Sequence, residues 1–138
     1  MMADRQTTLR SPVTLEGIGV HSGAPACLCL RPSAANTGVV FLRKGLEGGH
    51  EQLIHARHNK VSATELCTVV GEQASGSVAT IEHLMSACAG LGLDNVLVEI
   101  DGPEMPIMDG SASEFVKAIE AAGIVALGAA RRYLKVLR

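Results

Sequence analysis

The apolar positions of this chain follow two different periods, and their order along the sequence predicts the arrangement of the fold. Short alternating or continuous apolar runs, rich in Val, Ile and Leu and bounded by Gly or Pro, predict strands. These runs lie at residues 7–9, 26–30, 38–42, 54–61, 66–70, 95–100 and 124–127. Most of the expected strands therefore precede the helical part of the pattern.

One helix is expected from Thr80, a favourable N-cap residue, to Gly90 or Gly92, either of which can end a helix in the left-handed conformation. Apolar residues recur there at the spacing i, i+3, i+4 and i+7, which places them on one face. They are Ile81, Leu84, Met85 and Cys88. This face is predicted to pack against the sheet.

A second helix is expected after Ser111, because Ser111 and Glu114 have the spacing of a capping box, and Gly123 is placed to end it. Its apolar face comprises Ala112, Phe115, Val116 and Ile119. Strands that cluster ahead of two well-separated helices predict an α+β fold, here a two-layer domain with a mainly antiparallel sheet backed by two helices. This domain is assigned to residues 1–128, and residues 129–138 are predicted to start a further strand.

Composition narrows the possible functions. Of the 138 residues, 47% are hydrophobic, but the aromatic residues are one Tyr and two Phe, with no Trp. A core of aliphatic side chains is expected, and the lack of aromatics argues against a stacking platform for nucleic acid. A net charge of −2 provides no basic stripe for a phosphate backbone.

The compartment is predicted from the apolar segments and the cysteines. No stretch approaches the ~20 apolar residues of a membrane span, and the first residues contain no apolar run typical of a signal peptide. The four cysteines form no paired knuckle of a structural zinc site. We therefore expect a cytoplasmic protein with four free, buried thiols.

The dipeptide Glu82–His83 is the first candidate for chemistry. Both residues fall in the first turn of the first predicted helix, and His83 lies opposite the apolar face, where its neighbours are small. Two interpretations fit this position. The pair is either an exposed helix start, with an acid suited to the helix dipole, or a place where an acid and an imidazole face a ligand.

Asp109 and His21 are weaker candidates. Asp109 ends an apolar loop at the start of the second predicted helix, where it either satisfies backbone donors or orients another group. His21 lies in a glycine-dense turn, which suits a tight loop or a close approach of the backbone to a ligand. The three remaining histidines have no spacing that converges on one metal ion and are predicted to lie on the surface; they are His50, His55 and His58.

Five segments in fixed order resemble the amino-terminal half of the zinc-dependent UDP-3-O-acyl-N-acetylglucosamine deacetylases of lipid A biosynthesis. They are residues 17–23 (GIGVHSG), 31–38 (RPSAANTG), 66–68 (LCT), 80–84 (TIEHL) and 103–112 (PEMPIMDGSA). The resemblance implies two similar α+β domains with the active site between them. It implies hydrolysis of the acetamide of UDP-3-O-(3-hydroxyacyl)-N-acetylglucosamine.

The resemblance also implies residue roles. Glu82 corresponds to the general base and His83 to one zinc ligand, with Asp109 and His21 in supporting positions. The substrate cleft is bordered by Leu66 and Cys67.

One feature of the family is absent from this sequence. The family takes two further zinc ligands from an H-x-x-x-D motif in its second half, and no histidine here is followed by Asp four residues later. Residues 129–138 then correspond to the opening strand of a missing second domain. We expect an incomplete zinc site, no turnover by the chain alone, and an apolar face that promotes self-association. A non-catalytic binding or interaction module, or a split enzyme completed in trans by a second polypeptide, are the alternatives.

Overall fold

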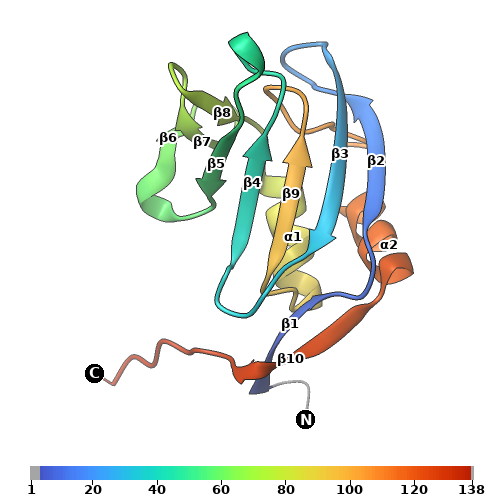
Figure 1. The fold of residues 1–138 in the computed structure, drawn as a ribbon, viewed down its shortest axis with the longest axis vertical. Helices are drawn as coiled ribbons and strands as arrows, with labels where there is room; N and C mark the ends of the chain where they lie inside the picture. The colour runs from blue at the N-terminus through green and yellow to red at the C-terminus, as the bar shows by residue number, and fades with distance from the viewer. Residues whose placement is uncertain (1–3, 138) are drawn as a thin grey trace.

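The computed structural model describes residues 4–137, and Figure 1 shows an α+β fold in which two helices lie behind one sheet. The described residues form two α-helices, α1 (Glu82–Leu91) and α2 (Ser113–Ala122). They also form ten strands, namely β1 (Arg5–Leu9), β2 (Val13–Ile18), β3 (Pro25–Pro32), β4 (Val39–Arg43), β5 (Gln52–His55), β6 (Val61–Ala63), β7 (Val69–Glu72), β8 (Gly76–Val78), β9 (Val96–Ile100) and β10 (Ile124–Ala130). The predicted α+β class is confirmed.

The main sheet has five strands in the order β2-β3-β9-β4-β5. Its pairs are antiparallel except β4 and β9, which run parallel with Val39 opposite Val96 and Arg43 opposite Ile100. Two smaller sheets flank it, one of β1 with β10 and one of β6, β7 and β8. The sheet is mainly antiparallel, as predicted, and β9 enters between two strands that precede it in sequence.

The core lies between the main sheet and the two helices. Alternate residues of the strands point to this side, and the apolar faces of α1 and α2 cover them. Both phenylalanines, Phe41 on β4 and Phe115 on α2, are fully buried here. The predicted apolar faces are confirmed in outline, with Leu84 and Ile119 fully buried and Met85 packed at the margin.

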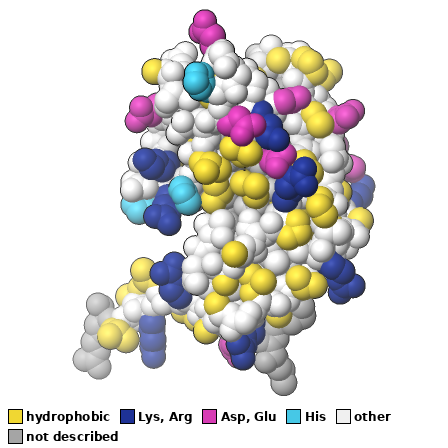
Figure 2. Space-filling view, viewed as in Figure 1, with side chains coloured by type: hydrophobic (Ala, Val, Ile, Leu, Met, Phe, Trp, Pro, Cys, Tyr) yellow, Lys and Arg dark blue, Asp and Glu magenta, His cyan; other side chains and the backbone are white. Residues whose placement is uncertain are grey.

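The opposite face of the sheet is open to solvent in Figure 2, where apolar and charged side chains are interspersed. Arg31 and Lys44 both pair with Glu99 at 2.7 Å on this face. All four cysteines are free thiols, but only Cys88 is buried, and its burial raises the pKa of the thiol to about 12. Cys27, Cys29 and Cys67 are only half-buried, which corrects the expectation of four buried thiols.

The observed strands differ from the predicted ones in three places. β2 and the three-residue β8 were not expected, although β2 alternates in burial along its whole length. The predicted strand 54–61 is interrupted by a 3-10 helix, η3 (His58–Lys60), so that β5 and β6 are separate. The predicted strand 66–70 begins only at Val69, because Leu66 has a left-handed backbone.

The predicted N-cap of α1 is wrong, and the capping box predicted for α2 is present only in part. The N-cap of α1 is Ile81. Thr80 has φ +59°, and its hydroxyl donates a hydrogen bond to Glu104. The assigned N-cap of α2 is Ala112, which makes no capping bond, but the hydroxyl of Ser111 accepts a hydrogen bond from the N–H of Ser113 at 3.0 Å, so Ser111 does satisfy a donor at the start of this helix. Glu114 pairs with Lys117 at 2.7 Å instead of reaching back.

The helix ends are as predicted. Gly92 ends α1 in the left-handed conformation, with φ 66°, and Gly123 ends α2. A second 3-10 helix, η2 (Glu47–Gly49), lies in the connection between β4 and β5.

The two ends of the chain meet in a small sheet at one end of the molecule (Figure 1). β10 pairs antiparallel with β1 and continues to Ala130, beyond the predicted end at residue 127. Residues 131–137 form no strand, so the strand expected there is wrong for the described part of the segment. The domain boundary after residue 128 stays a prediction. In the described range, neither helix is long and apolar enough to cross a membrane.

Candidate functional site

The predicted pair Glu82–His83 occupies the first two positions of α1, and both side chains are half-buried. The carboxylate of Glu82 accepts a hydrogen bond from the backbone N–H of Thr68, at 3.1 Å from Oε2. The N–H of Ile81 in turn bonds the carbonyl of Thr68 at 3.4 Å. The loop that carries Leu66 and Cys67 is therefore fastened to the start of the helix on which Glu82 and His83 lie.

Within residues 4–137, four non-glycine residues have a left-handed backbone, and three of them are predicted site residues or lie within two positions of one. They are Leu66, Thr80 and Met108, with φ of 60°, 59° and 54°. This conformation is unusual for Leu and Met and more costly for a β-branched Thr. Such strain persists only where the surroundings impose it, and it concentrates at functional sites.

Glu104 provides the contacts that impose the conformation of Thr80. It is 3% exposed and accepts hydrogen bonds from the N–H groups of His21 (3.1 Å) and Ser22 (2.8 Å) and from the hydroxyl of Thr80 (2.9 Å). Burial acts to raise its pKa, but hydrogen bonds from the Ser22 hydroxyl, both N–H groups and Thr80 outweigh it and hold the pKa of Glu104 at about 2. A buried carboxylate thus joins the glycine-dense turn to the start of α1.

The glycine-dense turn closes around this carboxylate. A Cβ atom on Gly19 would lie 2.3 Å from Oε2 of Glu104 and 2.4 Å from the Ser22 hydroxyl oxygen, so only glycine fits. The sequence suggested close approach of backbone to a ligand, and the group approached is a side chain of the same chain. The imidazole of His21 is exposed at the tip of the turn.

Asp109 has other hydrogen-bond partners than Glu82. Its side chain is exposed, and its Oδ1 accepts hydrogen bonds from the N–H (2.9 Å) and the hydroxyl (2.8 Å) of Ser111. These bonds, with the Ser111 hydroxyl first, lower the pKa of Asp109. The interpretation that Asp109 satisfies donors ahead of α2 is confirmed.

Asp109 also borders a shallow, mainly apolar cavity of about 600 Å³, shared with Ile18, Ile107 and Met108. The N–H of Ile107 bonds the carbonyl of Ile18 at 3.0 Å, which joins the loop of Asp109 to the strand that leads to His21. The structure thus brings Glu82, Leu66 and Cys67 together through one loop. It joins His21 and Asp109 through Glu104 and Ile107.

Between residues 4 and 137, no group of three His, Cys, Asp or Glu side chains is placed to hold a metal ion. His83 fits as a single imidazole ligand, because it is half-buried and makes no hydrogen bond within that range. His50, His55 and His58 are exposed, as predicted. His58 belongs to the 3-10 helix η3 and not to the strand that carries His55.

Glu104 and Thr80 are the residues that sequence reasoning missed. Thr80 was assigned to a cap, and Glu104 was not singled out within its apolar segment. The available signal was an acid directly before Met-Pro-Ile-Met, because a carboxylate in an apolar run needs hydrogen-bond partners to be buried.

Comparison with known proteins identifies the family. The sequence profile of the UDP-3-O-acyl N-acetylglycosamine deacetylases matches residues 6–138. The chain belongs to this family. Among curated relatives, the UDP-3-O-acyl-N-acetylglucosamine deacetylase of Phenylobacterium zucineum is 48% identical over 132 residues, which are 96% of this chain and 45% of that protein.

The proteins of the same name from Photobacterium profundum and Brucella ovis are 46% and 41% identical to the chain. The matched regions are 43% and 46% of their lengths. The chain therefore spans somewhat less than half the length of these curated relatives, and the family resemblance inferred from the five segments is confirmed.

Proposed function

We propose that this chain supplies the amino-terminal part of the active site of a zinc-dependent deacetylase, with Glu82 as general base and His83 as one zinc ligand. The reaction is removal of acetate from UDP-3-O-(3-hydroxyacyl)-N-acetylglucosamine in lipid A biosynthesis, in the cytoplasm. The observation that carries the proposal is the placement of both residues in the first turn of α1, with Glu82 oriented by Thr68. Family membership supports the reaction class.

Glu82 has the arrangement that a general base requires. One carboxylate oxygen, Oε2, accepts a hydrogen bond from the Thr68 N–H, which holds this oxygen in place. The other oxygen has no hydrogen-bond partner in the part of the chain that the structure describes. This oxygen takes the proton from the water that attacks the acetamide carbonyl, and the proton is later available for the departing amine.

His83 is the one ligand that this chain contributes to the metal. A catalytic zinc site needs three protein ligands and an open position, and a bound zinc ion supplies a water of lowered pKa and a Lewis acid for the carbonyl. No histidine of the sequence precedes an Asp by four residues. We propose that the other two ligands come from a second domain or a second polypeptide.

Four further residues have proposed roles around this pair. Leu66, 86% exposed on its strained loop, and Cys67 border the substrate. Asp109 and His21 orient groups at the far side of the cleft, and their loops are fixed through Glu104 and Ile107.

The proposed incompleteness is tested on the 138-residue chain itself. We expect no acetate release from UDP-3-O-(3-hydroxyacyl)-N-acetylglucosamine with added zinc, and no sub-micromolar zinc binding by isothermal titration. Turnover comparable to a full-length relative, or tight zinc binding that disappears in H83A, would contradict an incomplete site. Addition of the separately expressed second half of the Phenylobacterium zucineum relative tests completion in trans.

The roles of Glu82 and His83 are tested in a chimera in which this chain replaces the matching segment of the Phenylobacterium zucineum enzyme. E82Q should lower kcat by about 10²–10⁴-fold while the zinc content stays the same. H83A should lower the zinc content. An E82Q chimera with the kcat of its parent would refute the base, and a non-catalytic module predicts no activity in any chimera that folds.

A further inference from the structure

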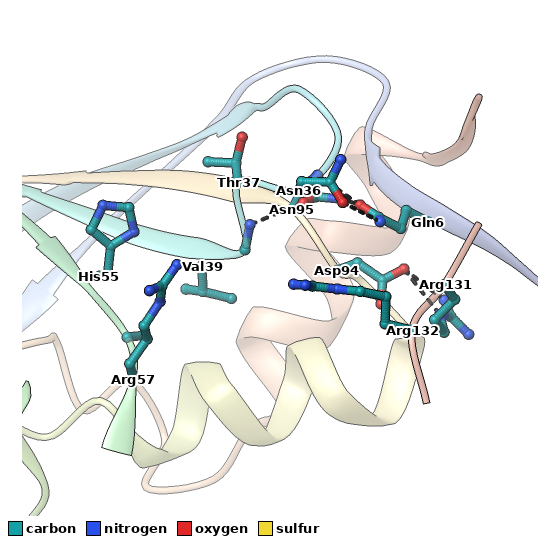
Figure 3. Close-up of a pocket in the computed structure, with 12 residues that line it drawn as sticks. Gln6, Asn36, Thr37, Val39, His55, Arg57, Asp94, Asn95, Arg131 and Arg132 are labelled. Atoms are coloured by element: carbon teal, nitrogen blue, oxygen red, sulfur yellow. Dashed lines mark hydrogen bonds and ion pairs between the residues drawn. The ribbon is translucent and has the colours of Figure 1, made fainter. Parts of the chain in front are cut away.

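A second polar cavity lies at the carboxyl-terminal end of α1, at the opposite end of the helix from Glu82 and His83. It has a volume of about 290 Å³ and is lined by residues from five parts of the chain, including Asn36, Thr37, Val39, Arg57, Asp94 and Arg132. Figure 3 shows Arg57 and Arg132 extending from opposite sides toward Val39. In Figure 2 the molecule is hollowed on this side, and basic side chains border the hollow.

One wall of the cavity is held rigid by a network of amide side chains. Gln6 donates to Oδ1 of Asn36 (2.9 Å) and accepts from the Asn36 N–H (2.7 Å) and from Nδ2 of Asn95 (3.1 Å). Oδ1 of Asn95 accepts from the N–H of Gly38 at 2.9 Å. These bonds occupy the side-chain amide oxygens of Gln6, Asn36 and Asn95. Within residues 4–137, the Thr37 hydroxyl and the Asn36 amide NH2 group donate to no other group, so both are available as donors.

The charges of the cavity are not balanced. Its single carboxylate, Asp94, is already engaged by the N–H of Thr7 (2.9 Å) and by Arg131 at 2.8 and 3.1 Å. Arg57 and Arg132 form no ion pair within residues 4–137. Three arginines against one aspartate leave two positive charges uncompensated in a chain whose net charge is −2.

We propose that this cavity binds a tetrahedral phosphoryl oxyanion, either free phosphate or the phosphate group of an ester. Guanidinium groups on two sides and hydroxyl and amide donors on a third match oxygens that point in several directions, whereas a carboxylate offers two oxygens in one plane. Pockets for small-molecule ligands measure about 300–1,000 Å³, so the volume of about 290 Å³ lies at the lower end of this range and accommodates a phosphoryl group. A bound dianion also relieves the repulsion between the two guanidinium groups.

The proposal is tested on the 138-residue chain by NMR titration at constant ionic strength with inorganic phosphate, methyl phosphate and acetate. Phosphate or its ester should shift the amides of residues 36–38 and 57 saturably. Whichever of the two binds more tightly identifies the free or the esterified source. The result does not depend on deacetylation, because zinc and the Glu82 end of α1 are not involved.

Variants identify the binding groups. R57Q and R132Q should each weaken binding by on the order of tenfold, the loss expected for one charged hydrogen bond. K60Q is the matched control, because Lys60 is an exposed cation on the same connection that does not line the cavity. Absence of saturation by millimolar phosphate in the unmodified chain would overturn the proposal. Equal affinity in all three variants, or acetate binding as tight as phosphate, would do the same.

Discussion

The two ends of helix α1 differ in how their charged groups are balanced. At the amino-terminal end, the carboxylates of Glu82 and Glu104 are held by backbone N–H groups and a hydroxyl. At the carboxyl-terminal end, Arg131 bonds the Gly92 carbonyl at 3.0 Å and pairs with Asp94. Acids at the start and a cation at the end both suit the helix dipole.

The two ends of α1 differ in whether the chain itself balances their charged groups. At the amino-terminal end the buried acid has all its partners, and strain is taken up by the backbone at Thr80 and Leu66. At the carboxyl-terminal end Arg57 and Arg132 face a cavity whose single carboxylate, Asp94, is already paired with Arg131. One end is fixed by interactions within the chain, while the other has a charge that a ligand can neutralise.

Removal of the buried carboxylate should have the largest effect on stability. E104Q leaves the N–H groups of His21 and Ser22 competing for one neutral oxygen, and we expect a loss of about 2–4 kcal/mol in the free energy of unfolding. Urea unfolding at pH 7 measures it. E120Q, at an exposed position of α2, is the matched control and should change stability by less than about 0.5 kcal/mol.

The acid dependence of stability should come from the same group. The pKa of Glu104 is about 2 in the folded protein, below its ordinary value of 4.5. Its contribution is therefore fully present above pH 4.5 and is lost as the pH falls toward 2, by about 2–3 kcal/mol. Between pH 6 and pH 2, the free energy of unfolding should fall less steeply in E104Q than in the unmodified chain. Parallel pH profiles of the two proteins would contradict the assignment to Glu104.

Two glycine substitutions compare the ends directly. In G19A the new Cβ meets Glu104 at 2.3 Å, and overpacking of this kind costs about 1–3 kcal/mol. In G90A the new Cβ on α1 meets nothing within 4 Å, and the change should stabilise the helix by about 0.5–1 kcal/mol. Thermal unfolding of both variants provides the measurement, and effects of the same sign would disprove the distinction.

The smallest effects are expected at the carboxyl-terminal end. R131Q breaks a partly exposed pair with Asp94, with side-chain exposures of 24% and 26%, and should cost about 0.5–1 kcal/mol. R57Q and R132Q remove charges that have no anionic partner among the described residues, so stability without phosphate should change by less than about 0.5 kcal/mol. A larger loss in either variant would reveal a contact absent from the structure.

Much of the fold could be predicted because its signals are local. Period-two runs identified β3, β4 and β9, and apolar faces at helical spacing identified α1 and α2. β2 was missed although Val13-Thr14-Leu15-Glu16 alternates, because its glycines suggested a turn. The insertion of β9 between β3 and β4 depends on long-range pairing, for which a single sequence has no local signal.

The site, like the fold, was predictable only where its signals are local in the sequence. The position of His83 off the apolar face follows from helical spacing, and the structure keeps it half-buried and without a partner in the described range. The role of Glu104 could not be read from spacing, because its partners lie in two distant segments. Thr80 was wrongly assigned as a helix cap for the same reason, since its hydroxyl hydrogen-bonds Glu104 and not a backbone N–H of the helix that follows.

The hydrogen bonds of Glu104 also have a consequence for the order of folding. The residues that they join are separated by 83, 82 and 24 positions in the sequence. Each bond must therefore close a long loop before it contributes to stability. α1 can form early from its own apolar face, but the turn at His21 can be fixed only after Glu104 has approached it from the distant part of the chain. Substitutions at Glu104 should therefore accelerate unfolding and leave the refolding rate nearly unchanged, which is the behaviour of contacts absent from the transition state.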